Sequence, residues 1–459
     1  MFALYSILLT IGFILMLPLL FLRKKKYAAG FWQRFGYFPA LRQNENSVIW
    51  IHCVSVGETN AAVPLVTAIK KQFPDYQIVI STVTRTGQEL AHKLFSEQAN
   101  LIFYFPFDWK FTVLRALRKI KPNIVLIVET EIWFNFIREA KKRGAQIFIV
   151  NGRLSEKSAD RYLKIRKMMS RVLHYVDQAL MQTNADAQRI LHLGINPHKV
   201  KVTGNIKFDQ QPIPEESLFL SYFSERFDIT PENPLIVAAS THAPEEKWIL
   251  EAFKTVYKNR TVNLPRLLLA PRHPERFDEV AETIRKSGLK LVRRSSPLMF
   301  DDVSADVVLL DSIGELRQVF SLAEIVFVGG SLIPHGGQNI LEPAIAGKAI
   351  ITGFYTMNFA EIVKTFEQNE AVIRLPQLKE NEIPEKLAEV FLDLLETEEK
   401  RRKLADNAFE MMEKNRGATD KTMKFLSPTL KVQSGKIIVS DQSEQIVGLE
   451  NLFKTNLSE

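Results

Sequence analysis

From residue 47 onward, short apolar runs alternate with stretches in which apolar residues recur at helical spacing. In the first half, apolar runs and helix-like stretches follow one another at residues 48–54, 61–72, 78–82, 87–95, 112–120, 124–128, 136–143, 147–150 and 179–181. Regular alternation of strand and helix is typical of an α/β domain with a mostly parallel sheet. The pattern therefore predicts a Rossmann-like, doubly wound domain in this half of the chain.

The same alternation begins again in the second half. A segment with several prolines and few strand signals, residues 210–234, separates the halves, and apolar runs then recur at 235–239, 267–270, 307–310, 325–328, 349–352 and 371–373. We therefore predict Rossmann-like domains over residues 27–209 and 235–425, with 210–234 as a linker and 426–459 as a C-terminal tail. Two such domains in tandem are expected to face a central cleft, because ligands bind outside the carboxyl ends of the strands in these folds.

The N-terminus carries a different pattern. Residues 1–22 contain no charged side chain, and four basic residues, 23–26, follow at once. About 20 apolar residues suffice to span a hydrocarbon core, and the basic cluster after them predicts that the rest of the chain is cytoplasmic. The charges follow the apolar run and no cleavage site is evident, which disfavours a signal peptide. Residues 1–26 are predicted to be a transmembrane anchor with its basic flank, and a shallow interfacial anchor is the alternative.

Composition and charge narrow the chemistry further. Of 459 residues, 46% are hydrophobic and 24% are charged, which excludes disorder, collagen and coiled coil. The net charge of +8 suggests an anionic partner, and beside an apolar N-terminus we expect anionic lipid and no nucleic acid. A single cysteine, Cys53, excludes an intramolecular disulfide, a cysteine zinc cluster and an iron–sulfur centre.

The clearest chemical motif lies in the second half. An apolar run ends in Gly329 and Gly330, and a loop with Gly336 and Gly337 precedes a helix predicted to begin near Asn339. Glycines let the backbone approach a ligand, and the start of a helix favours a phosphate. The spacing is neither the G-x-G-x-x-G of nicotinamide sites nor a Walker loop, which disfavours a dehydrogenase. The alternative is a plain strand–turn–helix connection that needs glycine for packing.

Two more segments of this half end strands at the same predicted edge. Arg272, after the run 267–270, can form paired hydrogen bonds with a phosphate or carboxylate. The alternative is a helix-start arginine paired with Glu275. Residues 311–316 likewise close a strand and open a helix, and their free backbone groups could recognise a pyrimidine edge.

The first half offers acid–base chemistry at strand ends. Glu58 follows the run 48–54 at a strand-to-helix corner, where the helix start lowers the pKa of a carboxyl and burial raises it. A base that abstracts a proton from a hydroxyl has to be ionised. Glu129 and Glu131 follow the run 124–128, and two acidic residues at a second strand end are hard to explain as helix capping. For Glu58, the alternative is an ordinary residue of the first helical turn.

Five motifs, taken together, resemble a known family. They are S-V-G-E at 55–58, E-T-E-I-W at 129–133, G-N-I-K-F-D at 204–209, P-R-H-P-E-R at 271–276 and G-G-Q-N-I-L-E-P-A at 336–344. In this order, over about residues 1–415, they resemble the 3-deoxy-D-manno-oct-2-ulosonic acid (Kdo) transferases of Gram-negative lipopolysaccharide synthesis. The resemblance implies a GT-B glycosyltransferase at the cytoplasmic side of the inner membrane. Such an enzyme moves Kdo from CMP-Kdo to the lipid A precursor (lipid IVA) with inversion, and it needs neither a metal nor a cofactor.

The resemblance also implies roles for individual residues. Glu58 falls on the general base, and Glu129 and Lys207 fall on residues that stabilise the transition state. The predicted CMP contacts are Pro271, Arg272, Ile313, Gly314, Glu315, Gly336, Gly337, Gln338, Asn339, Ile340, Leu341 and Glu342. Secondary candidates are Ser55, Gly57, Arg85, Glu131 and His273. Where the family commonly has W-P-N, this chain has Trp133-Phe134-Asn135, which makes the start of that helix less certain.

Two other functions are compatible with this pattern. One is a membrane-anchored GT-B glycosyltransferase that uses a UDP-sugar, which would prefer UDP over CMP. The other is a two-domain binding protein without turnover, in which Glu58→Gln would leave function unchanged.

Overall fold

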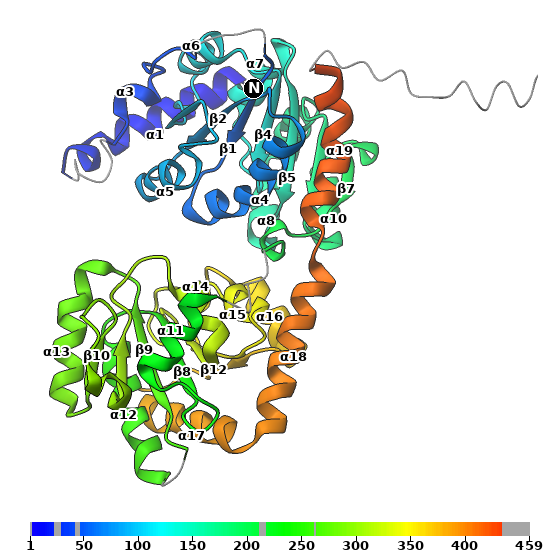
Figure 1. The fold of residues 1–459 in the computed structure, drawn as a ribbon. Coiled ribbons are helices and arrows are strands. Elements are labelled where there is room, and N and C mark those ends of the chain that lie inside the picture. The colour runs from blue at the N-terminus through cyan, green and yellow to red at the C-terminus, as the bar shows by residue number, and fades with distance from the viewer. Residues whose placement is uncertain (1, 23–28, 42–45, 211–216, 261–262, 434–459) are drawn as a thin grey trace, which may run out of the picture. The chain divides into compact units, whose positions relative to one another are not determined.

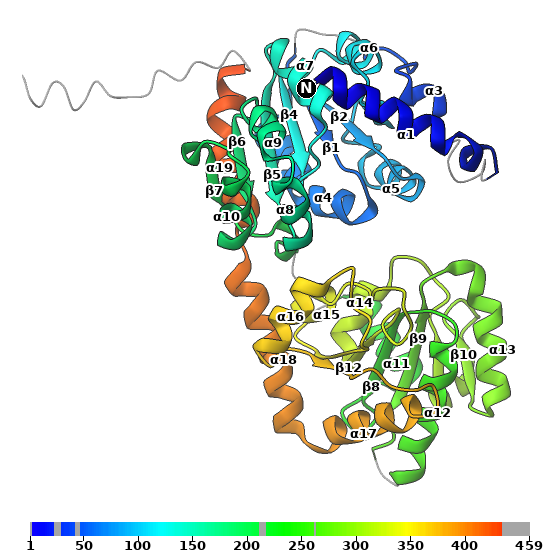
Figure 2. The ribbon, with the colours of Figure 1, turned by 180° about the vertical axis from the view of Figure 1, so that it is seen from behind.

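The chain folds into two compact units. The computed structural model describes residues 2–22, 29–41, 46–210, 217–260 and 263–433, and for 2–22 it describes side chains only at residues 2 and 5–15. Unit 1 comprises Met1–Lys207 and Gly417–Glu459, and unit 2 comprises Phe208–Arg416. Figures 1 and 2 show both units from opposite sides.

Unit 1 is built on a seven-stranded parallel sheet with the order β3-β2-β1-β4-β5-β6-β7. Its strands are β1 (Val48–His52), β2 (Gln77–Thr82), β3 (Leu101–Tyr104), β4 (Ile124–Val128), β5 (Gln146–Gly152), β6 (Gln178–Met181) and β7 (Val200–Val202). Its larger helices are α4 (Val56–Gln72), α5 (Arg85–Phe95), α6 (Lys110–Ile120), α7 (Phe134–Lys142), α8 (Glu156–Leu163), α9 (Arg166–Leu173), α10 (Asn184–His192) and α19 (Ala418–Gln433).

The two faces of this sheet each carry a hydrophobic core, and β4 shows the reason. Val125 and Ile127 belong to one core, while Ile124, Leu126 and Val128 belong to the other. Because successive side chains of a strand point to opposite faces, a strand covered by helices on both sides has to be apolar throughout. This explains why continuous apolar runs located the strands.

Unit 2 repeats the plan with the strand order β10-β11-β9-β8-β12-β13-β14. Its strands are β8 (Leu235–Thr241), β9 (Arg266–Pro271), β10 (Leu291–Arg293), β11 (Val307–Leu309), β12 (Ala323–Val328), β13 (Ala349–Thr352) and β14 (Ile373–Arg374). Its helices include α11 (Leu218–Phe227), α12 (Glu245–Asn259), α13 (Phe277–Ser287), α14 (Leu316–Val319), α15 (Leu341–Ile345), α16 (Ala360–Gln368), α17 (Ile383–Glu396) and α18 (Glu398–Asn415), with the short η3 (Pro274–Arg276) before α13. The prediction of two doubly wound α/β domains is confirmed.

The limits of the predicted domains differ from those of the structure. The predicted linker contains α11, whose Phe223 and Phe227 are fully buried in the core of unit 2. The chain also returns to unit 1 through α19 (Figure 1), whose Leu426 and Leu430 are buried beside α4 residues in one core. The segment from 426 to 433 is therefore part of a packed helix, and residues 434–459 of the predicted tail lie outside the described residues.

Helix α1 (Phe2–Leu22) lies along unit 1 (Figure 2) and packs through one of its faces. Phe13 meets Trp109 edge-on with 4.9 Å between the ring centroids, and Trp109 Nε1 donates a hydrogen bond of 2.9 Å to Thr10 Oγ1. Tyr5 stacks on Phe134 at a centroid distance of 4.7 Å. The opposite face exposes Ile7, Leu8, Ile11, Ile14 and Leu15.

The predicted transmembrane span is not supported. Among the residues that the structure describes, no helix is both long enough and apolar enough to cross a bilayer. The basic flank at residues 23–26 lies outside the described residues.

Candidate functional site

Glu58 lies in the first turn of α4, directly after the central strand β1. Its side chain folds back, so that Oε2 accepts a hydrogen bond of 2.5 Å from the Val54 N–H and Oε1 accepts one of 3.1 Å from the Ser55 hydroxyl. Ser55 is the N-cap of the helix. A glutamate in this position satisfies backbone groups that the helix start leaves unpaired. Glu58 is only 6% exposed, so the carboxyl combines a capping contact with burial.

Glu129 and Lys207 form an ion pair at the same end of this sheet. Glu129 follows β4 with a φ of +59°, a left-handed conformation that costs a non-glycine residue about 1–3 kcal/mol and clusters at functional sites. Lys207 Nζ lies 3.0 Å from Glu129 Oε1, and the side chains are 19% and 21% exposed. The backbone N–H of Ile206 donates to the buried Asn151 Oδ1 at 3.0 Å, which positions the neighbouring lysine.

Burial and the charge of Glu129 raise the pKa of two acidic groups at this end of the sheet. Burial raises the pKa of Glu58 to about 8, and the charge of Glu129 adds to the rise, while the hydrogen bonds from Val54 and Ser55 oppose it. Burial and Glu129 also raise the pKa of Glu131. For Glu58, burial therefore outweighs the helix start, and its carboxyl is largely protonated at pH 7.

The secondary candidates of unit 1 have ordinary surroundings. Arg85 begins α5 and makes an exposed ion pair with Glu89 at 2.8 Å. A Cβ atom added to Gly57 would meet nothing closer than Ser55 Oγ at 3.9 Å, so this position does not require glycine. Neither residue shows a feature of its own that marks a site.

The altered W-F-N motif still begins a helix. Phe134 is the first residue of α7. The buried carboxylate of Asp108 accepts hydrogen bonds from the backbone N–H groups of Asn135 and Phe136, at 3.0 and 2.8 Å. These bonds satisfy donors at the helix start, which explains how the helix begins without a proline.

His52, which the sequence patterns did not single out, lies at the end of β1. Its Nδ1 is 2.9 Å from Ser81 Oγ, and its ring stacks on Phe105 at a centroid distance of 3.9 Å. Burial lowers the pKa of His52 to about 3, so the ring is neutral. The only signal in the sequence was a polar residue within an apolar run.

In unit 2, a buried carboxylate that was not predicted holds the glycine turn after β12. Glu245 Oε2 accepts hydrogen bonds from the N–H groups of His242 (3.0 Å) and Gly330 (2.7 Å), and Oε1 accepts from Ser331 (3.0 Å) and Leu332 (2.9 Å). Glu245 is 0% exposed. One side chain thus connects the ends of β8 and β12, the two strands at which the strand order reverses.

The second glycine pair requires glycine for its conformation. Gly336 and Gly337 have φ values of +96° and +74°, and the Gly337 N–H donates to the Gly330 carbonyl at 2.8 Å. A Cβ atom on Gly336 would lie 2.6 Å from Asn358 Nδ2. The predicted contact residue Gln338 follows this pair, and its Nε2 would lie 3.3 Å from a Cβ atom on Gly330. The two glycine pairs therefore form one folded loop.

The helix after this loop differs from the prediction. Helix α15 begins at Leu341 and has five residues, and Asn339 Oδ1 accepts from the Leu341 N–H at 3.1 Å. Ile340 and Leu341 are buried in the core at 0% and 1% exposure. Their side chains are not accessible, so they can offer a ligand only backbone groups. A helix of five residues also has a small dipole, which adds little positive potential at its N-terminus.

The predicted contacts Arg272 and Glu342 lie close enough for their charges to interact. Burial raises the pKa of Glu342, and the charges of Arg317 and Arg272 oppose that rise. Arg272 is exposed, while Arg276, further along the motif, makes the ion pair with Glu246 at 2.7 Å. Glu275, the partner that the alternative assigned to Arg272, lies near His273, with Oε1 3.7 Å from His273 Nδ1.

The loop after β11 presents the remaining predicted contacts. Gly314 has a φ of +99°, and Ile313 is 68% exposed. Glu315 is held by Arg294, whose Nη2 lies 3.0 Å from Glu315 Oε1, and by the hydroxyl of Ser312. An outward-facing isoleucine on a tethered loop offers an apolar surface to a planar base.

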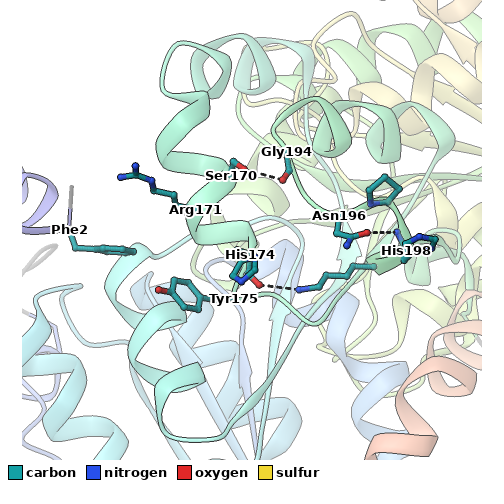
Figure 3. A pocket seen from close by; sticks show the side chains of 10 residues that line it. Phe2, Ser170, Arg171, His174, Tyr175, Gly194, Asn196 and His198 are labelled. Atoms are coloured by element: carbon teal, nitrogen blue, oxygen red, sulfur yellow. Dashed lines mark hydrogen bonds between the residues drawn. The ribbon is translucent and has the colours of Figure 1, made fainter.

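A hollow in unit 1 involves none of the predicted site residues. It has a volume of about 800 Å³, and Figure 3 shows Phe2, Arg171, His174, Tyr175 and His198 among the side chains that line it. In the described parts of both units, this hollow included, no group of histidine, cysteine or acidic side chains is arranged to hold a metal ion.

Comparison with known proteins gives consistent matches. A family model described as 3-Deoxy-D-manno-octulosonic-acid transferase (kdotransferase) matches residues 29–210. The 3-deoxy-D-manno-octulosonic acid transferase of Haemophilus influenzae is 33% identical over 90% of this chain and 94% of its own length. The enzyme of that name from Chlamydophila psittaci is 30% identical over 79% and 82%. A putative UDP-N-acetylglucosamine 2-epimerase from Listeria monocytogenes superposes with a TM-score of 0.54 at 15% identity, over 86% of this chain and 100% of that chain, which concerns the fold alone.

The raised pKa of Glu58 predicts a pH-dependent difference in stability between the protein and Glu58→Gln. Since the folded value of about 8 exceeds the ordinary 4.5, the folded state favours the protonated acid, and the stability that this contributes is lost as pH rises from about 5 to 8. Glutamine does not titrate, so the variant should gain stability relative to the natural protein over this range, by up to about 1.4 kcal/mol per pH unit. Urea unfolding at pH 5, 6.5 and 8 measures the difference. The exposed Glu89→Gln is the control, and a difference independent of pH for Glu58→Gln would contradict the assignment.

Proposed function

The chain belongs to the 3-deoxy-D-manno-octulosonic acid transferase family, and on this premise we propose that it transfers Kdo from CMP-Kdo to the lipid A precursor, lipid IVA, in lipopolysaccharide synthesis. In this proposal the reaction inverts the anomeric carbon, Glu58 is the general base, and neither a metal nor a cofactor takes part. The observation that carries the mechanism is the group formed by Glu58, Glu129 and Lys207 at the carboxyl end of the unit 1 sheet. Membership of this family favours Kdo over a uridine-linked sugar.

The reaction requires a base, because the pKa of a sugar hydroxyl lies far above 7. As the hydroxyl oxygen bonds to the anomeric carbon, its proton passes to Glu58, and the bond from that carbon to the phosphate oxygen breaks with its electron pair on CMP. A carboxylate whose pKa is about 8 accepts a proton more readily than an ordinary one. Lys207 offsets the charge of Glu129 across their 3.0 Å pair.

Unit 2 supplies groups suited to the CMP part of the donor. The exposed Arg272 guanidinium can bind a phosphate through two hydrogen bonds. The loop of Gly336 and Gly337 allows close approach of its backbone. Dipoles and cations that are already in place stabilise a leaving phosphate without a metal.

The outer face of α1 is suited to a lipid surface. Ile7, Leu8, Ile11, Ile14 and Leu15 follow helical spacing, so they form one exposed apolar stripe. The other face of α1 packs on unit 1 through Tyr5 and Phe13, so this stripe is the face that remains available to lipid. We propose that this stripe contacts the inner membrane, where a lipid acceptor would be found.

Transfer of Kdo and binding of CMP are expected to depend on different residues. With CMP-Kdo and lipid IVA, mass spectrometry should show Kdo-bearing product for the natural protein and a loss of about 100-fold or more in rate for Glu58→Gln, since general base catalysis contributes about 10²–10⁴. Calorimetry should show unchanged CMP affinity for Glu58→Gln and weakened affinity for Arg272→Ala. Wild-type rates in Glu58→Gln would refute the base, and tighter binding of UDP than of CMP would refute the donor.

The acidity of Glu58 should also appear in the pH dependence of the rate. The rate should rise as pH approaches about 8, because the base becomes ionised. Glu129→Gln removes the repulsion that raises this pKa, so its midpoint should move down by about one pH unit even where the maximal rate falls. Initial rates from pH 5.5 to 9.5 measure both midpoints. With Glu89→Gln as the control, an unchanged or higher midpoint in Glu129→Gln would contradict the proposed coupling.

Membrane contact through α1 can be tested with vesicles that contain anionic lipid. Ile11→Ser with Leu15→Ser should lower the partition coefficient onto the vesicles, measured by cosedimentation, by about 100-fold or more, because the two changes together remove about 3–6 kcal/mol of apolar transfer energy from the stripe. Leu218→Ser in unit 2, where Leu218 is 92% exposed, is the matched control. Equal cosedimentation of all variants would show that the stripe does not contact lipid.

A further inference from the structure

Three histidines from three separate loops meet at one edge of the unit 2 sheet. His242 follows β8, His273 follows β9, and His335 lies in the loop between β12 and α15. The ring centroid of His242 lies 5.3 Å from that of His273 and 4.7 Å from that of His335. His242 is 9% exposed, and the other two are exposed. Of these, only His273 was singled out by the sequence patterns.

The backbone around His242 fixes the ring at the glycine loop. Its N–H donates to Glu245 at 3.0 Å, and Nδ1 lies 3.2 Å from the Ser240 carbonyl oxygen. Ser240 has a φ of +55°, a left-handed conformation that is uncommon for a serine. A Cβ atom on Gly330 would lie 3.5 Å from His242 Nδ1. The histidine cluster therefore borders the turn predicted to receive a phosphate.

The hydrogen bond to Ser240 determines what the other ring nitrogen can do. A carbonyl oxygen can only accept, so Nδ1 of His242 carries the proton of that bond. In the neutral ring, Nε2 is then an acceptor, which repels an anion. It becomes a donor to an anion only when the ring takes up a second proton.

The central ring of the cluster is neutral unless an anion lies beside it. Burial lowers the pKa of His242 to about 4, and His335 and His273 add to this effect, while the Ser240 carbonyl and Glu246 oppose it. His242 is therefore a neutral ring at pH 7. An anion beside this ring would raise its pKa, because it favours the charged form.

The acidic side chains near His242 have other partners or are exposed to water, so they do not supply the negative charge that would protonate the cluster. Glu245 is occupied by four backbone N–H groups, and Glu246 is paired with Arg276 at 2.7 Å. Glu275 Oε1 lies 3.7 Å from His273 Nδ1, and the Glu275 side chain is 75% exposed, so water screens its charge. The neighbouring Arg272 adds a positive charge at the same strand end.

We propose that His242, His273 and His335 form an anion subsite that takes up a proton when the donor binds and returns it when the product leaves. The ligand is an anionic group of the donor, either its phosphate or its sugar carboxylate. The identity of this ligand rests on the proposed function, whereas the proton uptake is argued from the positions of the three histidines. Protonated imidazoles donate charge-assisted hydrogen bonds, so donor affinity should depend on the three rings more strongly at low pH than at high pH.

The test measures the dissociation constants of cytidine, CMP and CMP-Kdo by calorimetry at pH 6 and pH 8. His242→Asn and the exposed His335→Gln are compared with the natural protein, and His192→Asn in unit 1 is the control. At each pH we compare the ratio of the dissociation constant of the variant to that of the natural protein, because the effect of the ligand's own ionisation is the same in both and cancels. For an anionic ligand, the ratio should be about tenfold at pH 6, the equivalent of one charge-assisted hydrogen bond, and should fall towards one at pH 8.

The ligands distinguish the sources of the anion. A pH-dependent ratio for both CMP and CMP-Kdo identifies the phosphate, and one for CMP-Kdo alone identifies the carboxylate. The proposal is overturned if the ratios do not depend on pH, or if cytidine, which has no anionic group, shows the same ratios. If CMP and CMP-Kdo both fail to bind the natural protein, the proposed function fails as well, so the two failures are distinguishable.

Discussion

The chemistry that we propose for unit 1 depends on the proton affinity of one buried carboxyl group. Glu58 caps its own helix with hydrogen bonds from Val54 and Ser55, and both bonds favour the ionised form. Burial and the charge of Glu129 act in the opposite direction and outweigh them. Lys207, paired with Glu129 at 3.0 Å, keeps that repulsion from being larger. A carboxyl balanced in this way changes its ionisation with small changes in the charges around it.

Unit 2 contains a glutamate in the equivalent place, and burial raises its pKa too, but its hydrogen bonds are different. Glu58 and Glu245 both lie in the first turn of the helix that follows a central strand at which the strand order reverses. Glu245 is fully buried and accepts hydrogen bonds from four backbone N–H groups, so it holds the glycine loop in place. Glu58 accepts from one backbone N–H and one hydroxyl, which leaves capacity for a proton. The same local position thus serves structure in one unit and proton transfer, as we propose, in the other.

The sequence was informative where a single property determined the outcome. Strands buried on both faces are continuously apolar, so the predicted runs end within two residues of the observed strands. The edge strands β3, β7 and β10, which are partly or largely exposed, were not predicted. Strand-end residues such as Glu129 and Arg272 could be located, because parallel strands end at one edge. The Glu245 hydrogen bonds and the meeting of His242 with His335 depend on loops far apart in the sequence, so local patterns could not reveal them. The sequence predicted that burial raises the pKa of Glu58 and that the helix start lowers it, but it could not tell which effect is larger.

Helix α1 shows that hydropathy alone does not tell which surface an apolar side chain faces. An apolar side chain has the same hydropathy whether it faces protein or lipid, yet Phe13 packs against Trp109 while Leu15 is 73% exposed. Thr10, within the apolar run, donates to the Ser6 carbonyl and accepts from Trp109, so it has a role that a lipid environment would not provide. The same ambiguity affected the predicted linker, where prolines suggested an irregular segment although Phe223 and Phe227 lie one helical turn apart in the core. In both places, the spacing of individual side chains around the helix decides the partner, and the average composition of the segment does not.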